Sequence, residues 1–200
     1  MSTPSAYQRV NTATDYDADP SKFPAYLRFD GVDDALQTGN INFTSTDKMT
    51  VWAGVTKLSD AAASILLENN DNSDNNQGSF YITAPEVAGS SRFSFRSRGS
   101  VVTAPVNLYG NAAPISRVVA AIGDIGGDIS TIRAGGASAT NAQDQGTGNY
   151  GNYPLYIGAR AGTSIFFNGR LYSLIVRGAQ TSLSQIEATE LYIKQKARMP

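Results

Sequence analysis

The sequence contains no cysteine and no histidine among its 200 residues. Without cysteine there is no disulfide framework and no thiolate chemistry. Without histidine the chain lacks the commonest general base and the commonest transition-metal ligand. These two absences exclude a Ser-His-Asp or Cys-His enzyme, and with them a zinc site built from histidine and cysteine.

The chain also has little net charge and no long apolar run. Its formal net charge is −1, with no basic stripe and no acidic tail. Duplex nucleic acid needs clustered Lys and Arg, so we expect no nucleic-acid partner. No apolar segment reaches membrane-spanning length, so we expect no membrane insertion. Residues 1–20 show neither a basic nor an apolar signal region, and we interpret 1–24 as an N-terminal arm or linker before one domain at 25–200.

Most of the chain alternates apolar and polar residues with a period of two. In "RFSFRSR" (92–98) Phe93 and Phe95 point one way and the Arg and Ser side chains point the other. "MTVWAGV" (49–55) places Val51, Ala53 and Val55 on one face and Trp52 on the other, where we expect Trp52 in the core. About ten such strands, separated by turns rich in Asn, Asp and Gly, indicate a sandwich or a barrel.

Two segments near the C-terminus differ from this pattern. "FFNGRLYSLIVRG" (166–178) is the longest strand candidate, with Leu171 and Ile175 on one face and Tyr172, Leu174 and Val176 on the other. Because both faces are apolar, we expect it in the middle of a sheet. "SLSQIEATELYIKQKARM" (182–199) predicts a helix with a Ser184–Glu187 capping box and cations near its end at Lys194, Lys196 and Arg198.

Three stretches together resemble a known family. They are "YLRFDGVDDAL", "MTVWAGV" and "LYIGARAGTSIFFNGRLYSLIVRGAQTSLSQIEATELYIKQK". In this order they are similar to the concanavalin A-like, laminin-G-like jelly rolls, particularly those of bacteriophage tail and virion proteins. The resemblance implies an all-β fold of two antiparallel sheets with a short C-terminal helix. The family's functions range over sugar binding, protein adhesion and purely structural roles, so the resemblance predicts the fold more than the function.

Three aspartates, Asp30, Asp33 and Asp34, gather between two strand candidates. The favoured interpretation is turn chemistry, in which Asp30-Gly31 makes a tight bend and the carboxylates bond local backbone N–H groups. A Ca²⁺ site is an alternative, although the segment lacks EF-hand spacing. A catalytic pair is the third interpretation.

The enzymatic activity most compatible with this fold class is glycoside hydrolysis, which needs two carboxylates flanking a bond. The Glu-x-Asp-x-x-Glu motif of jelly-roll glucanases is missing, so we expect no enzymatic activity.

The loop "NNDNSDNNQG" (69–78) offers oxygen ligands in series. Alternating Asp and Asn side chains suit Ca²⁺. The candidate ligands are Asn70, Asp71, Asn72 and Asp74. The alternative is a solvated hairpin loop. We expect no cofactor other than Ca²⁺.

Two further groups are candidates for ligand binding. "GNYGNYPLY" brings Tyr150, Tyr153 and Tyr156 together with Asn149 and Asn152. Tyrosine rings stack on sugars and amides fix hydroxyls, while edge packing or an oligomer interface is the alternative.

The other group lies on one strand, where Arg92, Arg96 and Arg98 share a face. This face could clamp an anionic sugar or a partner's carboxylates. The simpler interpretation is a solvated strand face that discourages edge pairing.

The sequence as a whole predicts a non-enzymatic binding or structural module of a phage virion. Its expected role is adhesion to a host-surface glycan or attachment to another virion protein, by loops held on a rigid sandwich. Weak contacts would be multiplied by copy number on a tail, fibre or capsid, and a homotrimer is a further expectation for a fibre-borne domain. A purely structural virion domain and a glycan-cleaving enzyme are the rival hypotheses.

Overall fold

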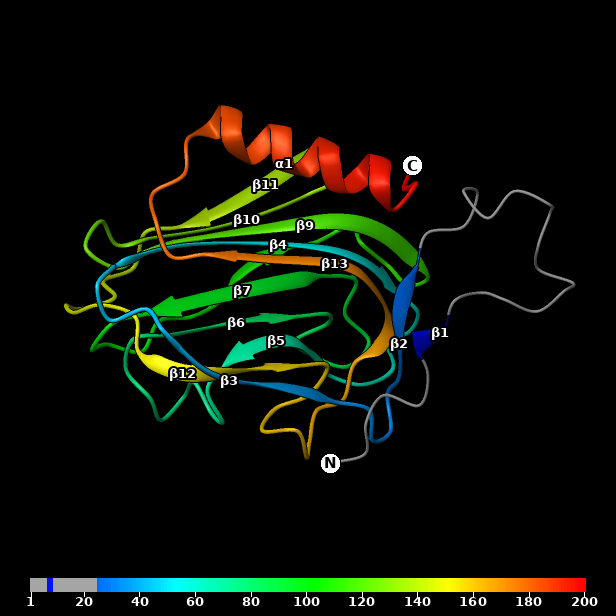
Figure 1. Cartoon of the computed structure of the whole chain (residues 1–200), viewed down its shortest axis with the longest axis horizontal. Coiled ribbons are helices and arrows are strands. Elements are labelled where there is room, and N and C mark those ends of the chain that lie inside the picture. The colour runs from blue at the N-terminus through cyan, green and yellow to red at the C-terminus, as the bar shows by residue number, and fades with distance from the viewer. Residues whose placement is uncertain (1–6, 9–24) are drawn as a thin grey trace, which may run out of the picture.

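Two antiparallel sheets pack face to face in the computed structural model, which describes residues 7–8 and 25–200 (Figure 1). The seven-stranded sheet contains β1 (Tyr7–Gln8), β2 (Tyr26–Asp30), β13 (Asn168–Arg177), β4 (Lys48–Lys57), β9 (Ile115–Asp124), β10 (Ile129–Ala134) and β11 (Ala137–Asn141), in this spatial order. The six-stranded sheet contains β3 (Leu36–Asn42), β12 (Asn152–Ile157), β5 (Ile65–Asn69), β6 (Ser79–Thr83), β7 (Phe93–Arg98) and β8 (Val106–Leu108). The prediction of a two-sheet antiparallel sandwich is confirmed.

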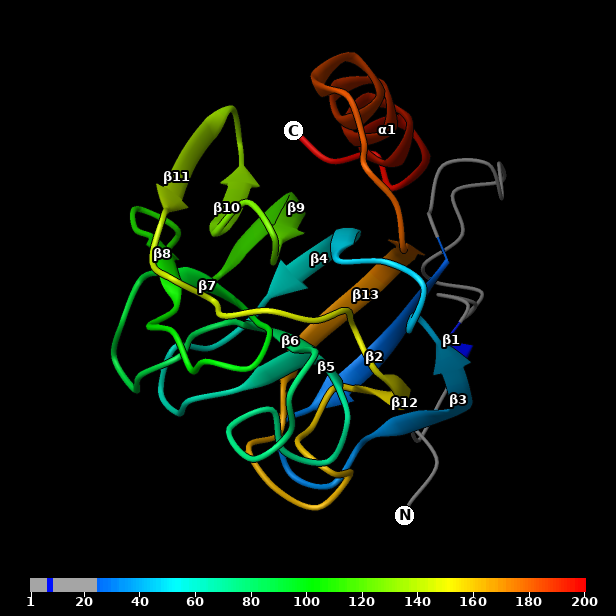
Figure 2. The same ribbon diagram turned by 90° about the vertical axis from the view of Figure 1, so that its left-hand side faces the viewer.

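Alternating apolar side chains fill the space between the sheets. From the seven-stranded sheet, Val51, Ala53 and Val55 of β4 are fully buried in this core. From the opposite sheet, Phe93 and Phe95 of β7 meet them, as their spacing predicts. Seen from the end of the sandwich, the two sheets form separate layers (Figure 2). The period-two pattern therefore specified which faces turn inward.

Strand β13 lies between β2 and β4, which confirms its predicted interior position. Its facing pattern differs from the prediction, because the register with β4 shifts between Leu171 and Ser173. This irregularity changes the phase of the alternation. Leu171, Leu174 and Val176 all pack against the main core, while Ile175 packs on the opposite side.

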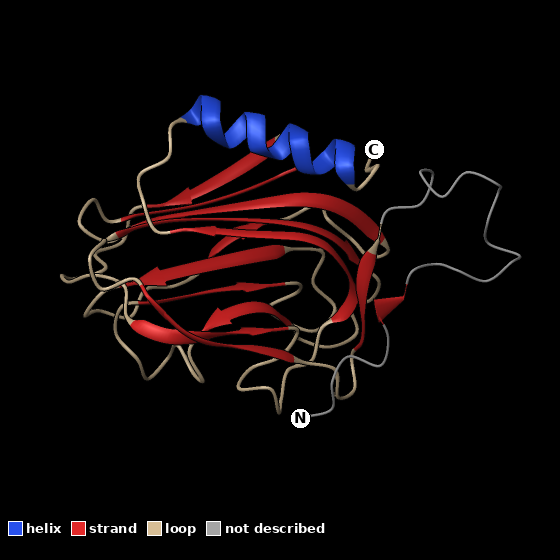
Figure 3. Ribbon diagram, in the orientation of Figure 1, coloured by secondary structure: helices blue, strands red, loops and turns tan. Residues whose placement is uncertain are grey.

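The single helix of the described residues is α1 (Leu183–Lys196), which lies outside the seven-stranded sheet (Figure 3). Its capping box joins Ser182 and Gln185, two residues earlier than predicted. Ser182 has extended backbone angles, and its hydroxyl accepts the N–H of Gln185 at 3.3 Å. The Ser184–Glu187 prediction was wrong because both residues already lie inside the helix.

An apolar cluster on the outer face of the seven-stranded sheet holds α1. Ile186 and Ile193 of the helix pack on Trp52 and Ala120. Gly54 makes room for this contact, since a Cβ atom there would lie 2.7 Å from the Ile193 side chain. Trp52 is 3% exposed, so the prediction of a buried role for it is confirmed.

An ion pair secures one side of the helix. The Arg133 guanidinium, on β10, donates to both carboxylate oxygens of Glu190 at 2.8 and 3.2 Å. Glu190 therefore joins the helix to the sheet. The paired geometry favours strong charge-assisted hydrogen bonds.

The predicted arm at 1–24 falls mostly outside the described residues. The exception is β1, which pairs antiparallel with β2 at the edge of the seven-stranded sheet. Among the described residues no helix has the length and apolar character needed to cross a membrane.

Candidate functional site

A row of polar and aromatic side chains crosses the outer face of the six-stranded sheet. In the strand register each stands opposite the next, in the order Gln37, Tyr156, Glu68, Tyr81 and Arg96. None of the five belongs to the apolar core between the sheets. The row spans β3, β12, β5, β6 and β7, so residues distant in sequence become cross-strand neighbours.

One end of this row is enclosed and the other is open. Glu68 is fully buried, Tyr81 and Arg96 are each 5% exposed, and Gln37 on the edge strand is exposed. At the open end the Gln37 amide donates to the Tyr156 hydroxyl at 3.2 Å. At the closed end the Arg96 guanidinium lies 4.6 Å from the centre of the Tyr81 ring. This stacking orients the guanidinium through a cation–π contact.

Arg160, from the segment after β12, reaches over the row. Its Nε donates to Glu68 Oε2 at 3.0 Å, and its Nη1 donates to Asp74 Oδ2 at 3.2 Å. Burial acts to lower the pKa of Arg160, but the hydrogen bond and charge of Glu68 outweigh it and raise that pKa. Arg160 therefore remains a cation between two carboxylates.

The loop at 70–78, between β5 and β6, covers the enclosed end. Ser73 donates its backbone N–H to Glu68 Oε1 at 2.8 Å and accepts Arg96 Nη2 on its hydroxyl at 3.0 Å. Arg98 donates to the backbone carbonyls of Ser73 and Asp74 at 3.2 and 2.8 Å. The loop is thus attached to the sheet through arginines and one glutamate.

Positive charge exceeds negative charge in this cluster. The cluster holds three guanidinium groups and two carboxylates: Arg96 and Arg160 pair with Glu68 and Asp74, whereas Arg98 donates to backbone carbonyls of the loop. Burial and the charge of Arg96 lower the pKa of Arg98. Within the described part of the chain, the Nε groups of Arg96 and Arg98 are buried without a hydrogen-bond partner. Such a cluster favours an additional anion, because it has donors and charge in excess.

Burial also raises the pKa of Tyr81 to about 12, a shift that the charge of Arg96 opposes. Tyr81 is therefore a neutral phenol at physiological pH. Its hydroxyl is available as a donor rather than as a competing anion.

The predicted arginine face is brought together only in part. Arg96 belongs to the row and Arg98 lies two residues farther along β7, opposite Ser79; both are buried, so the solvated strand face predicted for them is wrong. The reason is that the 70–78 loop folds back over β7. Arg92 precedes β7 and pairs instead with Glu86 at 2.7 Å and with the Tyr109 hydroxyl at 2.9 Å.

The predicted tyrosine–asparagine platform does not form as one surface. Tyr150 is 1% exposed and packs edge-on against Phe80, with its hydroxyl bonded to Ser97. Its assignment as a ligand contact is therefore corrected to a core residue. Tyr153 donates to the Gln77 carbonyl at 3.1 Å, which ties it to the 70–78 loop.

The two asparagines of that platform lie at the surface. Asn149 donates its side-chain amide to the Thr44 carbonyl, and Asn152 is exposed at the start of β12. A role for Tyr153, Asn149 or Asn152 in sugar contact stays a prediction.

The proposed Ca²⁺ ligands of the loop are already engaged with N–H donors. Asp71 accepts from the Asn76 amide, which also lies 3.5 Å from the Asn70 side-chain oxygen. Asn72 accepts the backbone N–H of Asp74, whose own carboxylate lies against two arginines. A cation at Asp74 would compete with these guanidinium groups. Ca²⁺ binding here stays a prediction for titration.

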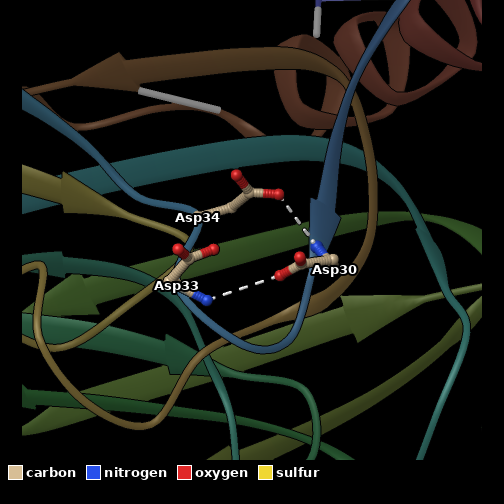
Figure 4. A group of neighbouring side chains, drawn as sticks. All are labelled: Asp30, Asp33 and Asp34. Atoms are coloured by element: carbon tan, nitrogen blue, oxygen red, sulfur yellow. Dashed lines mark hydrogen bonds between the residues drawn. The ribbon is translucent and has the colours of Figure 1, made fainter. Parts of the chain in front are cut away.

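The aspartate turn after β2 has the geometry that the sequence predicts (Figure 4). Asp30 Oδ1 accepts the Val32 N–H at 2.8 Å, and Asp34 Oδ2 accepts the Asp30 N–H at 3.1 Å. Gly31 has φ +83°, a value that glycine adopts without strain. Turn chemistry is confirmed, and one carboxylate oxygen from each of Asp30, Asp33 and Asp34 lies within 4.8 Å of the other two. Cation binding by this group stays a prediction.

Glu68, Tyr81 and Arg160 were missed as site residues, whereas Tyr156 was named with the tyrosines of "GNYGNYPLY". Glu68 and Tyr81 occupy outward positions in alternating strands, so their facing was readable from the sequence. Their alignment was not readable, because it depends on which strands pair and in which register. Arg160 was the last residue of a strand candidate at 153–160, but β12 ends at Ile157, and nothing in the sequence indicated that Arg160 would reach Glu68.

Comparisons with known proteins support the fold. A scan against protein-family models finds no match, and a search of curated protein sequences finds none either. Among solved structures, the chain is similar to the CBM40 module of the Ruminococcus gnavus IT-sialidase, described in complex with α2,3-sialyllactose. The two share 17% identity with a TM-score of 0.55, over 78% of this chain and 97% of the module.

Two other similar structures share the jelly-roll architecture. Domains LG4-5 of the mouse laminin α1 chain match at 12% identity and TM-score 0.54, over 78% of this chain and 41% of that one. The heptameric SAP-like pentraxin of Limulus polyphemus matches at 12% identity and TM-score 0.57, over 85% and 78%. These structures confirm the concanavalin A-like jelly-roll fold.

Proposed function

We propose that the outer face of the six-stranded sheet binds a glycan that carries a carboxylate. The observation that carries the proposal is the convergence of Arg96 and Arg160 on the Asp74 carboxylate, with Arg98 bonded to the Asp74 backbone beside them. Guanidinium groups recognise carboxylates through paired, charge-assisted hydrogen bonds. The similar Ruminococcus gnavus module, described with both α2,3- and α2,6-sialyllactose, supports an acidic sugar as the ligand class on this fold.

Arg160 and the open end of the row supply the first contacts for the same ligand. Arg160 has a 20% exposed side chain and is the first guanidinium that an incoming carboxylate meets. Gln37, exposed at the open end, offers both donors and an acceptor for sugar hydroxyls, and its amide is positioned by the hydroxyl of the buried Tyr156. The sheet holds these groups in a fixed register, so binding needs little ordering of the backbone.

Isothermal titration with 3′-sialyllactose and lactose tests the proposal, because the two sugars differ by the residue that carries the carboxylate. We expect saturable binding of sialyllactose and none of lactose at the same concentrations. Replacement of Arg160 by methionine should weaken sialyllactose binding about tenfold or more. Arg177→Gln is the matched control, because Arg177 is exposed on the other sheet. Equal affinity for the two sugars, or no binding of either, would contradict the proposal.

A purely structural role is the second candidate, and the burial of Arg96 and Arg98 favours it. In that case the charges serve only to fasten the 70–78 loop. Arg96→Met would then lower stability, and no acidic sugar would bind to the wild-type chain. The titration described above separates the two roles.

We further propose that the module acts without catalysis, on the surface of a phage particle. The phage setting rests on the sequence resemblance. The non-catalytic role rests on the cluster, because its two carboxylates, Glu68 and Asp74, are already paired with arginines. Incubation with sialyllactose followed by chromatography should show intact sugar. Sedimentation velocity tests the predicted trimer. Labelling of purified particles with antibodies against the domain tests its location on a tail, fibre or capsid.

A further inference from the structure

The carboxylate of Asp74 occupies the point where two arginines of the candidate site converge. Its Oδ1 lies 2.6 Å from Nη2 of Arg96, and its Oδ2 lies 3.2 Å from Nη1 of Arg160. The two guanidinium groups come from different elements, β7 and the segment after β12. One carboxylate thus bridges two cations, as a bound acid would.

Exposure differs sharply within this group. The Asp74 side chain is 48% exposed, while those of Arg96 and Arg160 are 6% and 20% exposed. The carboxylate therefore lies between solvent and the guanidinium groups. A ligand approaching from solvent meets Asp74 before it reaches Arg96.

The charge of Asp74 is held in place by its partners. Burial acts to raise the pKa of this carboxyl, but the hydrogen bond and charge of Arg96, together with Arg160, hold it below its ordinary value. Asp74 is accordingly an anion at neutral pH, like the carboxylate of an acidic sugar.

The surrounding loop makes an exchange feasible. Ser73 and Asp74 are fastened by hydrogen bonds to Glu68, Arg96, Arg98 and Arg160. Neither residue belongs to the apolar core. Another carboxylate can accept the same charge-assisted hydrogen bonds from Arg96 and Arg160 that Asp74 accepts. The apolar core of the sandwich would be untouched by such an exchange.

We propose that Asp74 is a built-in competitor that holds the place of the ligand's carboxylate and limits the affinity of the site. This inference rests on the proposed function. Binding then proceeds by exchange, in which the ligand's carboxylate takes the contacts with Arg96 and Arg160 and Asp74 turns to solvent. The module binds weakly as a single copy and gains strength only when several copies act together.

The test compares Asp74→Asn with Asp71→Asn by titration with 3′-sialyllactose and lactose. The first substitution keeps the shape of the side chain but removes the competing charge. Asp71 belongs to the same loop, and its carboxylate contacts Asn76 in place of an arginine. We expect Asp74→Asn to bind sialyllactose about tenfold more tightly than the wild-type chain, while Asp71→Asn leaves the affinity unchanged. Asp74→Glu keeps the charge and should bind no more tightly than the wild type.

The outcomes separate this inference from the proposed function. Binding of sialyllactose by the wild type, with equal or weaker binding by Asp74→Asn, overturns the competitor role and leaves the proposed function standing. No binding by either protein overturns the proposed function. Binding by Asp74→Asn alone supports both. Circular dichroism and the melting temperature establish that each variant is folded, and NMR signals of the Arg96 and Arg160 Nε–H groups follow the exchange directly.

Discussion

The two outer faces of the sandwich are both covered, but by opposite chemistry. On the seven-stranded sheet, α1 covers Trp52 and Ala120 with Ile186 and Ile193. On the six-stranded sheet, the 70–78 loop covers buried arginines. An apolar cover stabilises the fold by removing apolar surface from water, and no charged group has to be desolvated. A charged cover carries a desolvation penalty, and apolar replacements of buried ion pairs are often neutral or stabilising. The apolar face therefore accounts for stability alone, and the proposed binding of an acidic glycan would account for the charged one.

The largest effect is expected on the apolar face, from Trp52→Ala. Removal of this side chain leaves a cavity beneath α1 and should lower the free energy of unfolding by about 3–5 kcal/mol. Urea denaturation measures the change. Affinity for sialyllactose should not change in the folded variant. Tyr192→Ala, at a position 54% exposed on the same helix, should change stability by less than about 0.5 kcal/mol. A loss below about 1 kcal/mol for Trp52→Ala would show that the helix does not depend on this contact.

A smaller loss is expected on the charged face, from Glu68→Gln. This change leaves Arg160 without its buried partner and should cost about 2 kcal/mol, below the range for fully enclosed pairs because Arg160 is partly exposed. The same denaturation measurement applies. Glu187→Gln is the control, because the Glu187 side chain is 56% exposed and its ion pair with Arg133 is long, at 3.6 Å. If both substitutions were equally mild, Glu68 would not secure the loop.

The helix cap gives a third and smaller effect. Ser182→Ala removes the hydroxyl that accepts the Gln185 N–H and should cost about 1 kcal/mol. Ser184→Ala should change the midpoint of unfolding less, because Ser184 lies within the helix. A larger effect at Ser184 would restore the cap predicted from the sequence.

Acid should weaken the charged face selectively. The folded-state pKa of Asp74 is below its ordinary value of 3.8. Its contribution to stability is therefore fully present above that value and is lost as the pH falls through the lowered pKa. The stability difference between the wild type and Asp74→Asn should shrink over this interval. The difference between the wild type and Trp52→Ala should remain constant, and a parallel decline of both would argue against a local charge effect.

The fold was readable from the sequence because it depends on local patterns. Alternation placed Val51, Ala53 and Val55 inward and Trp52 outward, and the run of helix formers at 182–199 predicted α1. The predictions were wrong where a shift of one or two residues changes which side chain faces inward or caps the helix. The irregularity between Leu171 and Ser173 changed which side chains of β13 face the core. The helix cap is Ser182, although Ser184 also fitted the capping pattern.

The candidate site was less readable because it is made by long-range pairing. Arg96 was recognised as one of an arginine cluster, but its neighbours Asp74 and Arg160 approach it only after strands distant in sequence have paired. Glu68 and Tyr81 become neighbours only through the pairing of β5 with β6. The burial of Tyr150 likewise depends on tertiary packing, which composition does not reveal.

NMR chemical-shift mapping with 3′-sialyllactose tests the central claim most directly, because it locates the bound sugar on the chain. The account predicts shifts at Gln37, Glu68, Tyr81, Arg96 and Arg160, with further changes across the 70–78 loop and none along α1. Shifts confined to another surface, or a spectrum unchanged at saturating sugar, would contradict it.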